Sequence, residues 1–191
     1  MRRQLSLFPS SSCLLPVGFK YAPDVLCADQ ELALVDAFQD LPFKEFEFQG
    51  FLGKRRVVSF GWKYDFNTRE LRRGEELPDF LHEVRAKAAR FAGLPATDLQ
   101  QVLLTEYRPG AAIGWHKDKA VFGEVIGISL LSPCGFRFRR KIEGSWQRAS
   151  LTVAPRSAYL LQGPSRSEWE HSIPGVESLR YSITFRNFKS G

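Results

Sequence analysis

The stretch TEYRPGAAIGWHKD, residues 105–118, ends in two side chains that can bind a metal, His116 and Asp118, with one residue between them. On an extended strand residues i and i+2 point to the same face, so the spacing predicts a strand that carries both ligands. A third ligand has to come from another part of the chain. The candidates are few, because His82 and His171 are the only other histidines.

The sequence that follows alternates between short apolar runs and turn residues, which is typical of a mainly β protein. We expect strands at residues 101–107, 114–116, 125–131, 135–140, 146–153, 157–162, 168–171 and 179–188. Pro-Gly pairs such as Pro109-Gly110 and Pro174-Gly175 separate some of them. About eight strands with almost no helix between them predict a β-sandwich or a jelly roll.

The first half of the sequence predicts two helices and one further strand. Residues 29–39 place apolar side chains at Leu32, Val35 and Phe38, and Asp29 can cap the first turn. Residues 78–92 start with a proline and carry a second apolar stripe. Alternation at residues 43–51 predicts a strand between the two helices.

Length and composition predict one folded domain, residues 21–191, with an acidic partner. The 191 residues suffice for one sizeable core. The net charge of +6 favours nucleic acid first and an anionic membrane surface second. Three cysteines without a CxxC pair indicate a reducing compartment, and we expect a cytoplasmic protein. No apolar run approaches the roughly 20 residues of a transmembrane helix, and polar residues interrupt any signal peptide near the N-terminus.

Residues 1–20 are expected to form a flexible tail, because they lack a sustained period and contain the loop-like sequence PSSSCLLP. Within this tail, QLSLF at residues 4–8 resembles the bacterial sliding-clamp-binding motif. That resemblance implies that Leu5, Leu7 and Phe8 bind an apolar pocket of the clamp and that Gln4 makes polar contacts. The alternative is that the three apolar side chains pack on their own domain.

A basic and aromatic stretch, GKRRVVSFGWKYDF, occupies residues 53–66. If it is extended, Phe60, Trp62 and Tyr64 lie on one face. Together with Arg55 and Arg56, these rings suit a nucleic-acid contact, because phosphates need cations and unstacked bases need aromatic surfaces. We interpret residues 50–75 as a lid over the site. The alternative is that the rings face the core and the cations form a solvated rim.

His116, Asp118 and His171 have the ligand types of the facial triad that holds non-haem Fe(II), although the same types could also hold zinc. Arg180 and Arg186 share one face of the last predicted strand with Ser182 and Thr184, and a buried guanidinium needs a carboxylate partner. A dicarboxylate bound between the metal and an arginine meets both requirements. Six residues of strand span roughly 20 Å, so we expect Arg180 to bind the distal carboxylate and Arg186 to lie nearer the metal.

In this order, the motifs resemble the AlkB family of Fe(II)/2-oxoglutarate-dependent dioxygenases over about residues 50–188. They include TEYRPGAAIGWHKDK, the FGWKY stretch, HSIPGVESL and RYSITFR. The resemblance implies a double-stranded β-helix, which is a jelly roll, with N-terminal helices that buttress one sheet.

The resemblance also implies a chemistry. His116, Asp118 and His171 hold Fe(II), Arg180 pairs with the far carboxylate of 2-oxoglutarate, and Tyr107 donates a hydrogen bond to it. Molecular oxygen is used to oxidise 2-oxoglutarate and to hydroxylate an N-methyl group, which then leaves as formaldehyde. The implied function is repair of alkylated DNA carrying bases of the 1-methyladenine or 3-methylcytosine type, which must leave the base stack.

Two positions depart from the founding members of that family. Thr105 replaces an asparagine that contacts the cosubstrate, and Ala120 replaces an acidic residue that helps to choose the base. Substrate choice is therefore open. One alternative is the same chemistry on RNA, notably tRNA. Another is a non-catalytic basic β-domain that is recruited to the clamp.

Overall fold

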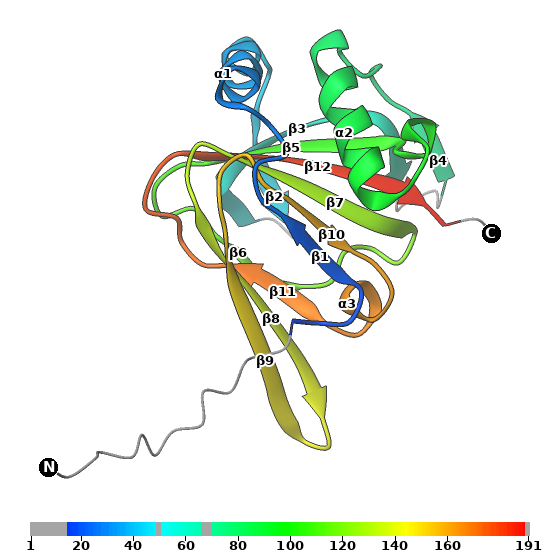
Figure 1. Ribbon diagram of the computed structural model, residues 1–191, viewed down its shortest axis with the longest axis vertical. Coiled ribbons are helices and arrows are strands. Elements are labelled where there is room, and N and C mark those ends of the chain that lie inside the picture. Colours follow the sequence, from blue (N-terminus) through cyan, green and yellow to red (C-terminus); the bar gives the residue numbers. More distant parts are fainter. Residues whose placement is uncertain (1–14, 49–50, 66–69, 190–191) are drawn as a thin grey trace, which may run out of the picture.

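Two antiparallel sheets face each other in the computed structural model, which describes residues 15–48, 51–65 and 70–189 (Figure 1). The larger sheet contains β1 (Phe19–Ala22), β2 (Lys44–Phe48), β3 (Phe51–Asp65), β4 (Glu70–Arg73), β5 (Gln101–Tyr107), β7 (Phe122–Leu130), β10 (Ala158–Leu161) and β12 (Arg180–Phe188). The smaller sheet contains β6 (Ile113–His116), β8 (Cys134–Ile142), β9 (Ser145–Val153) and β11 (Glu170–Ile173).

The strand orders are those of a jelly roll. They are β1-β10-β7-β12-β5-β3-β2 in the larger sheet, with β4 paired to β3, and β6-β11-β8-β9 in the smaller one. Neighbours in space are rarely neighbours in sequence, so the chain crosses repeatedly between the sheets. The predicted mainly β class and jelly roll are confirmed.

All eight strands predicted after residue 100 are present, and β5 has the predicted bounds. The missed elements include β4, inside the predicted lid, and two others. Strand β1 begins at Phe19, inside the segment predicted to be a tail, and pairs with β10. A short helix, α3 (Pro164–Ser167), precedes β11. The clamp-like peptide at residues 4–8 lies outside the described residues.

The larger sheet separates an outer core from an inner core, because side chains alternate between the faces of a strand. In β12, Tyr181, Ile183 and Phe185 belong to the outer core, which also contains side chains of the two helices. Tyr107 belongs to the inner core between the sheets, together with rings of β8 such as Phe138. The inner faces of β5 and β12 can therefore carry the polar side chains of a site.

The first helix, α1 (Ala28–Ala37), lies against the outer face, but its details differ from the prediction. Cys27 is the N-cap, and its backbone N–H donates to Oε1 of Gln30 at 3.0 Å, so Asp29 is not the cap. Leu32 is 62% exposed, whereas Glu31 is buried. The carboxylate of Glu31 accepts hydrogen bonds from the backbone N–H of Leu131 and from Arg156, and these distant partners turn it inward.

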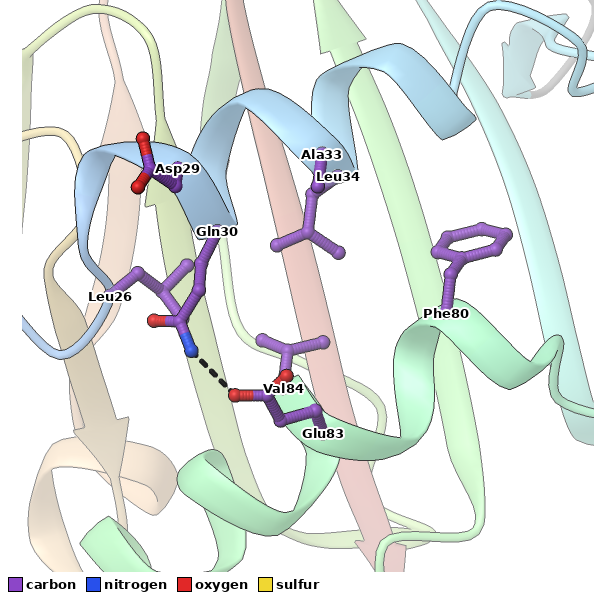
Figure 2. Close-up of a pocket in the computed structure, with 8 residues that line it drawn as sticks. All are labelled: Leu26, Asp29, Gln30, Ala33, Leu34, Phe80, Glu83 and Val84. Atoms are coloured by element: carbon purple, nitrogen blue, oxygen red, sulfur yellow. Dashed lines mark hydrogen bonds between the residues drawn. The ribbon is translucent and has the colours of Figure 1, made fainter.

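The second helix, α2 (His82–Ala92), follows a 3₁₀ turn at Asp79–Leu81 and confirms the prediction for this segment. Its C-cap is Gly93, in the left-handed conformation that favours glycine. Figure 2 shows the groove between α1 and α2, where Nε2 of Gln30 donates to Oε1 of Glu83. Among the described residues, no helix is long and apolar enough to cross a bilayer.

Part of the predicted lid belongs to the larger sheet. Residues 55–61 of β3 pair with β5, and β3 then pairs with β4 from Trp62 onward. The change of partner occurs at Gly61, which has a φ of +79° and a backbone carbonyl of Gln100 where a Cβ would lie. Only glycine suits this bend.

Candidate metal centre and cosubstrate pocket

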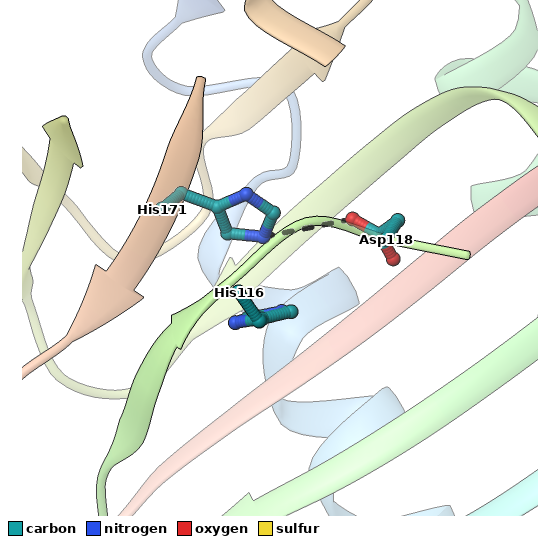
Figure 3. A group of neighbouring side chains, drawn as sticks. All are labelled: His116, Asp118 and His171. Carbon is teal, nitrogen blue, oxygen red and sulfur yellow. Dashed lines mark ion pairs between the residues drawn. The ribbon is translucent and has the colours of Figure 1, made fainter. Parts of the chain in front are cut away.

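The three predicted metal ligands lie together, as Figure 3 shows. Their ligand atoms all lie within 4.8 Å of one another. His116 and His171 are partners across β6 and β11, and their ring centroids are 4.3 Å apart. Asp118 follows the end of β6 in a loop, so the prediction that one strand carries both His116 and Asp118 is wrong for the aspartate.

A register shift aims the imidazoles inward. Strands β6 and β11 pair at His116 with His171 and again at Ile113 with Ile173. The shift lies between these two pairs, because β6 has one residue more than β11 in the interval. The extra residue on β6 lets Ile113 and His116, which are three residues apart, both face the inner core. Trp115 then points to the outside. The sequence does not reveal this shift, because it depends on the partner strand.

Both histidines are arranged as metal ligands. Nδ1 of His116 lies 2.9 Å from the carbonyl oxygen of Gly114, so a proton on Nδ1 leaves Nε2 available as a ligand. The ring of His171 stacks on Phe136 at an interplanar angle of 10°. Burial lowers the pKa of His171 to about 3, against the opposing effect of Asp118, so the imidazole is neutral as metal binding requires.

Asp118 is held as a carboxylate. Burial raises its pKa, but the nearby Arg186, His171 and His116 outweigh burial and bring the pKa to about 2. Arg186 donates from Nε to Oδ1 of Asp118 at 3.0 Å and from Nη1 to Oε1 of Gln101 at 2.8 Å. Arg186 thus lies next to the candidate metal ligands, where the sequence analysis expected it, and Gln101 is a neighbour that the sequence did not reveal.

Arg180 lies deeper in the inner core and lacks a complete set of partners. Its side chain is fully buried, and Nε donates to Oγ of Ser129 at 3.2 Å. Among the described residues Nη1 and Nη2 have no hydrogen-bond partner, and the guanidinium carbon lies 4.8 Å from the ring centroid of Tyr107. Leaving a buried cation unpaired is costly. The two free N–H groups are the complement of a carboxylate that binds them side by side.

The walls of this pocket come from β5, β7 and β10. Tyr107 is opposite Arg180 in the pairing of β5 with β12, and Thr105 is opposite Ser182. Tyr159, which the sequence analysis missed, lies over Gly127, so that a Cβ there would stand 2.1 Å from Cζ of the ring. Burial raises the pKa of Tyr159, so its phenol remains a hydrogen-bond donor.

The predicted substrate contacts divide between the two faces of β3. Phe60 is 4% exposed and packs in the outer core. This agrees with the alternative that the aromatic rings of this stretch face the core. Arg56 points to the same side and donates to Glu106 from Nη2 at 2.6 Å. Arg55 is the partner of Tyr107 in the pairing of β3 with β5, and its guanidinium lies 3.9 Å from the ring centroid of Phe46.

Trp62 and Tyr64, also predicted substrate contacts, follow the bend at Gly61. Trp62 is 38% exposed and pairs with Arg73 of β4. The side chain of Tyr64 lies outside the described part of the chain. Two of the predicted substrate contacts therefore remain candidates. Arg55 lies beside Tyr107, and Trp62 is exposed to a ligand.

A jelly roll that presents two histidines and an aspartate near a buried arginine without a full set of partners among the described residues is the arrangement expected of an iron-dependent oxygenase with a dicarboxylate cosubstrate. Residues 25–186 match the model of the 2OG-Fe(II) oxygenase superfamily, and the chain belongs to this superfamily as an AlkB-like member. The protein is therefore a dioxygenase that uses Fe(II), 2-oxoglutarate and molecular oxygen. The donor set fits Fe(II), and the free N–H groups of Arg180 fit 2-oxoglutarate.

Similar proteins include two curated relatives. An Arabidopsis thaliana protein described as "Alkylated DNA repair protein ALKBH8 homolog" is 30% identical over 147 residues, which are 64% of this chain and 42% of the relative. The Mus musculus "tRNA (carboxymethyluridine(34)-5-O)-methyltransferase ALKBH8" is 27% identical over 167 residues, which are 83% of this chain and 24% of the relative. The chain thus spans less than half of either relative.

Two solved structures share the fold. The structure of OsALKBH1 has a TM-score of 0.69 at 15% identity, covering 91% of this chain and 100% of that one. A Pseudomonas putida prolyl-4-hydroxylase has a TM-score of 0.63 at 12% identity, covering 91% of this chain and 94% of that one. At such identities the likeness concerns the fold alone.

Proposed function

We propose that this protein oxidatively removes alkyl groups from nucleic-acid bases, with His116, Asp118 and His171 holding the iron. One observation carries the proposal. The strands that supply the two histidines belong to a sheet whose outer face combines arginines with tryptophans. We name it the arginine–tryptophan face, and it consists of Trp115, Arg137, Arg139, Trp146 and Arg148.

Arg139 is the centre of this face. Its guanidinium lies 4.6 Å from the ring centroid of Trp115 and 4.4 Å from that of Trp146. Arg137 lies 5.1 Å from the ring of Trp115, and Arg148 is opposite Arg139 across β8 and β9. Glu170 pairs with Arg139 at 2.6 Å and holds it in place between the rings.

This combination suits a nucleic acid. Phosphates bind arginines, and unstacked bases stack on exposed rings. Trp146 is 42% exposed on the hairpin of β8 and β9, which projects from the rest of the molecule in Figure 1. We propose that the polymer is held on this outer face while one base leaves its stack and reaches the site on the inner side of the same sheet.

Within the site each residue has a separate task. Arg180 pairs with the far carboxylate of 2-oxoglutarate, Tyr107 donates a hydrogen bond to the cosubstrate, and Arg186 fixes the orientation of Asp118. Thr105 lines the same wall. When bound, iron with 2-oxoglutarate and oxygen supplies hydroxylation of a C–H bond, with 2-oxoglutarate oxidised to succinate and CO₂. The hydroxymethyl group on nitrogen then leaves as formaldehyde, and its hydroxyl proton passes to the nitrogen of a neutral base or, from a cationic base, to solvent.

DNA is our first proposed polymer, because the name of the Arabidopsis relative refers to repair of alkylated DNA. RNA is the second, because the name of the mouse relative refers to a tRNA. Recruitment to a sliding clamp through Gln4, Leu5, Leu7 and Phe8 is a separate proposal that rests on the sequence of the tail. A pull-down with the clamp in which deletion of residues 4–8 changes nothing would disprove it.

The proposed function is tested with matched DNA and RNA oligonucleotides, each carrying one methylated base, in the presence of Fe(II) and 2-oxoglutarate. We expect loss of the methyl group by mass spectrometry and release of formaldehyde. Replacing Arg139 and Trp146 together by alanine should weaken oligonucleotide binding at least tenfold, while succinate formation without oligonucleotide stays unchanged. Succinate formation that is never accompanied by demethylation of any oligonucleotide would overturn the proposal.

A further inference from the structure

Helix α3 connects the two segments that supply the candidate metal ligands. It directly precedes β11, which carries His171, and it contacts the loop after β6, which carries Asp118. Nζ of Lys117 donates to the carbonyl oxygen of Ser167 in α3 at 2.8 Å, although 50 residues separate the two in the chain. The loop and the helix are therefore joined in addition to the pairing between β6 and β11.

Arg166 makes a second connection, which runs from α3 back to the loop. Its Nη2 donates to the carbonyl oxygens of Lys119 and Phe122 at 2.5 and 3.1 Å. These two carbonyls belong to one turn, in which the backbone N–H of Phe122 donates to the carbonyl oxygen of Lys119 at 3.1 Å. The turn starts directly after Asp118. Arg166 therefore binds both ends of the turn that follows a candidate metal ligand.

The side chain of Arg166 is committed to this turn. The residue is only 9% exposed, its Nε has no hydrogen-bond partner among the described residues, and no carboxylate of those residues forms an ion pair with it. A buried cation is costly unless it is well partnered, and a charged donor makes stronger hydrogen bonds to carbonyl oxygens than a neutral one does. The hydrogen bonds of Arg166 thus stabilise one conformation of the turn.

The helix end of this connection is itself fixed to the smaller sheet. Trp169, which lies between α3 and His171, is 2% exposed, and its ring packs edge-on against Phe138 of β8 at 6.3 Å between the ring centroids. The guanidinium of Arg140, also in β8, lies 4.7 Å from the ring centroid of Trp169 and forms an ion pair with Glu168. Because α3 cannot shift without disturbing these contacts, it is a fixed support for the loop.

We infer that Arg166 is a positioning residue of the metal centre, which holds the loop after β6 so that Asp118 faces His171 before a metal binds. The inference rests on the proposed function, because it takes His116, Asp118 and His171 as the ligands. The role differs from that of Arg186, which bonds to the carboxylate itself. A loop that is already ordered loses less conformational freedom when the metal binds, so the affinity for the metal is higher.

The first test is a titration of the metal-free protein with Co(II), followed by absorption spectroscopy. Arg166→Met keeps an apolar chain of similar length but removes the charge and the hydrogen bonds, and should weaken Co(II) binding at least about tenfold. Arg166→Lys, which keeps a charged donor, should bind Co(II) within about threefold of wild type. Arg90→Met, on the exposed side of α2, is the control and should bind as wild type does. Unchanged affinity in Arg166→Met would overturn the inference.

A second test separates positioning of the loop from a role in the reaction itself. With a saturating concentration of Fe(II), Arg166→Met should form succinate with a kcat within about twofold of wild type and an unchanged KM for 2-oxoglutarate, because a bound metal holds Asp118 in place. A kcat that stays low although the metal site is filled would overturn the inference.

Hydrogen exchange of the wild-type protein needs no variant, and it decides the question even if Arg166→Met does not fold. The backbone N–H of Phe122 closes the turn, so it should be protected without metal, and Co(II) should slow its exchange by less than about threefold. Slowing of tenfold or more would show that the metal orders the loop, and would overturn the inference. Equal Co(II) binding by wild type and Asp118→Ala would instead refute the ligand assignment of the proposed function.

Discussion

Arg186 and Asp118 meet at a single carboxylate oxygen. Nε and Nη2 of Arg186 lie 3.0 and 2.9 Å from Oδ1 of Asp118, while Oδ2 lies 3.5 Å from Nε2 of His171. The arginine thus occupies one oxygen and leaves the other turned toward the histidine ligands. A carboxylate fixed in this way presents one oxygen to a metal without rotating.

The first prediction concerns this pair. Arg186→Gln should lower the affinity for Fe(II) by about 10- to 100-fold, which is the usual effect of removing a partner that orients a ligand. Metal titration of the apoprotein measures it. Arg90→Gln, on the exposed side of α2, is the control and should bind metal normally. Unchanged metal affinity in Arg186→Gln would contradict the assigned role.

The second prediction concerns Arg180, whose replacement should affect protein stability and 2-oxoglutarate binding in opposite directions. Arg180→Met removes a buried charge whose Nη1 and Nη2 are unpaired, so the ligand-free protein should become no less stable, or more stable by about 1 kcal/mol or more. Binding of 2-oxoglutarate should weaken by at least about tenfold, because a charged hydrogen bond contributes about 1.5–3 kcal/mol. Thermal unfolding with and without 2-oxoglutarate reads both effects. Strong destabilisation of the ligand-free variant would show that Arg180 has a mainly structural role.

The third prediction concerns the metal. The three ligands lie close together only in the folded chain, so a divalent ion binds the folded state in preference to the unfolded state. The melting temperature should therefore rise with the concentration of Fe(II) or another divalent ion. At 100 times the dissociation constant the gain is about 2.7 kcal/mol. Asp118→Ala should abolish both this gain and substrate turnover. A variant that keeps undiminished turnover would refute the ligand assignment.

The fourth prediction concerns pH and the buried Glu106 on the outer face of β5. The hydrogen bond from Arg56 is the main cause of its lowered pKa, with Arg108 contributing. A carboxylate whose pKa is lower in the folded state stabilises the fold above its unfolded pKa, and this stability is lost as the pH falls through the folded pKa. Glu106→Gln should therefore unfold more easily at pH 7, by about 1–3 kcal/mol.

The pH series separates charge from packing. The difference between wild type and Glu106→Gln should stay constant above a pH of about 4.5 and shrink below it. Urea unfolding at pH 7, 5, 4 and 3 measures the difference. A difference that does not change with pH would mean that the charge of Glu106 contributes nothing.

The fifth prediction concerns Gly127, which the ring of Tyr159 covers. Gly127→Ala should destabilise the protein by about 1–3 kcal/mol, because the added Cβ would stand 2.1 Å from Cζ of Tyr159. Displacing this ring should also weaken binding of 2-oxoglutarate. Gly114→Ala serves as the control for stability, because within the described part of the chain an added Cβ there would have no atom within 4 Å other than those of the adjoining residues. Equal melting temperatures for the two variants would contradict the prediction.

The sequence predicted those features that depend on the spacing of residues close together in the chain. The alternation in residues 180–186 gave one face with two arginines, and the bounds of β5 follow from its apolar run. The features it missed depend on distant partners. Ser129 and Gln101 gain their roles only because β7 and β5 flank β12. Phe60 could be read as a lid ring or as a core ring, since only the helices decide which face of β3 is covered.

The alternation in β12 also protects the protein against misfolding. A slip of one residue between β12 and its neighbours would exchange the faces of the strand. Arg180 and Arg186 would then enter the apolar layer beneath the helices, and Tyr181 and Phe185 would enter the site. The two arginines thus serve as register markers, since a misaligned sheet would bury their charges without the cosubstrate or Asp118 to receive them.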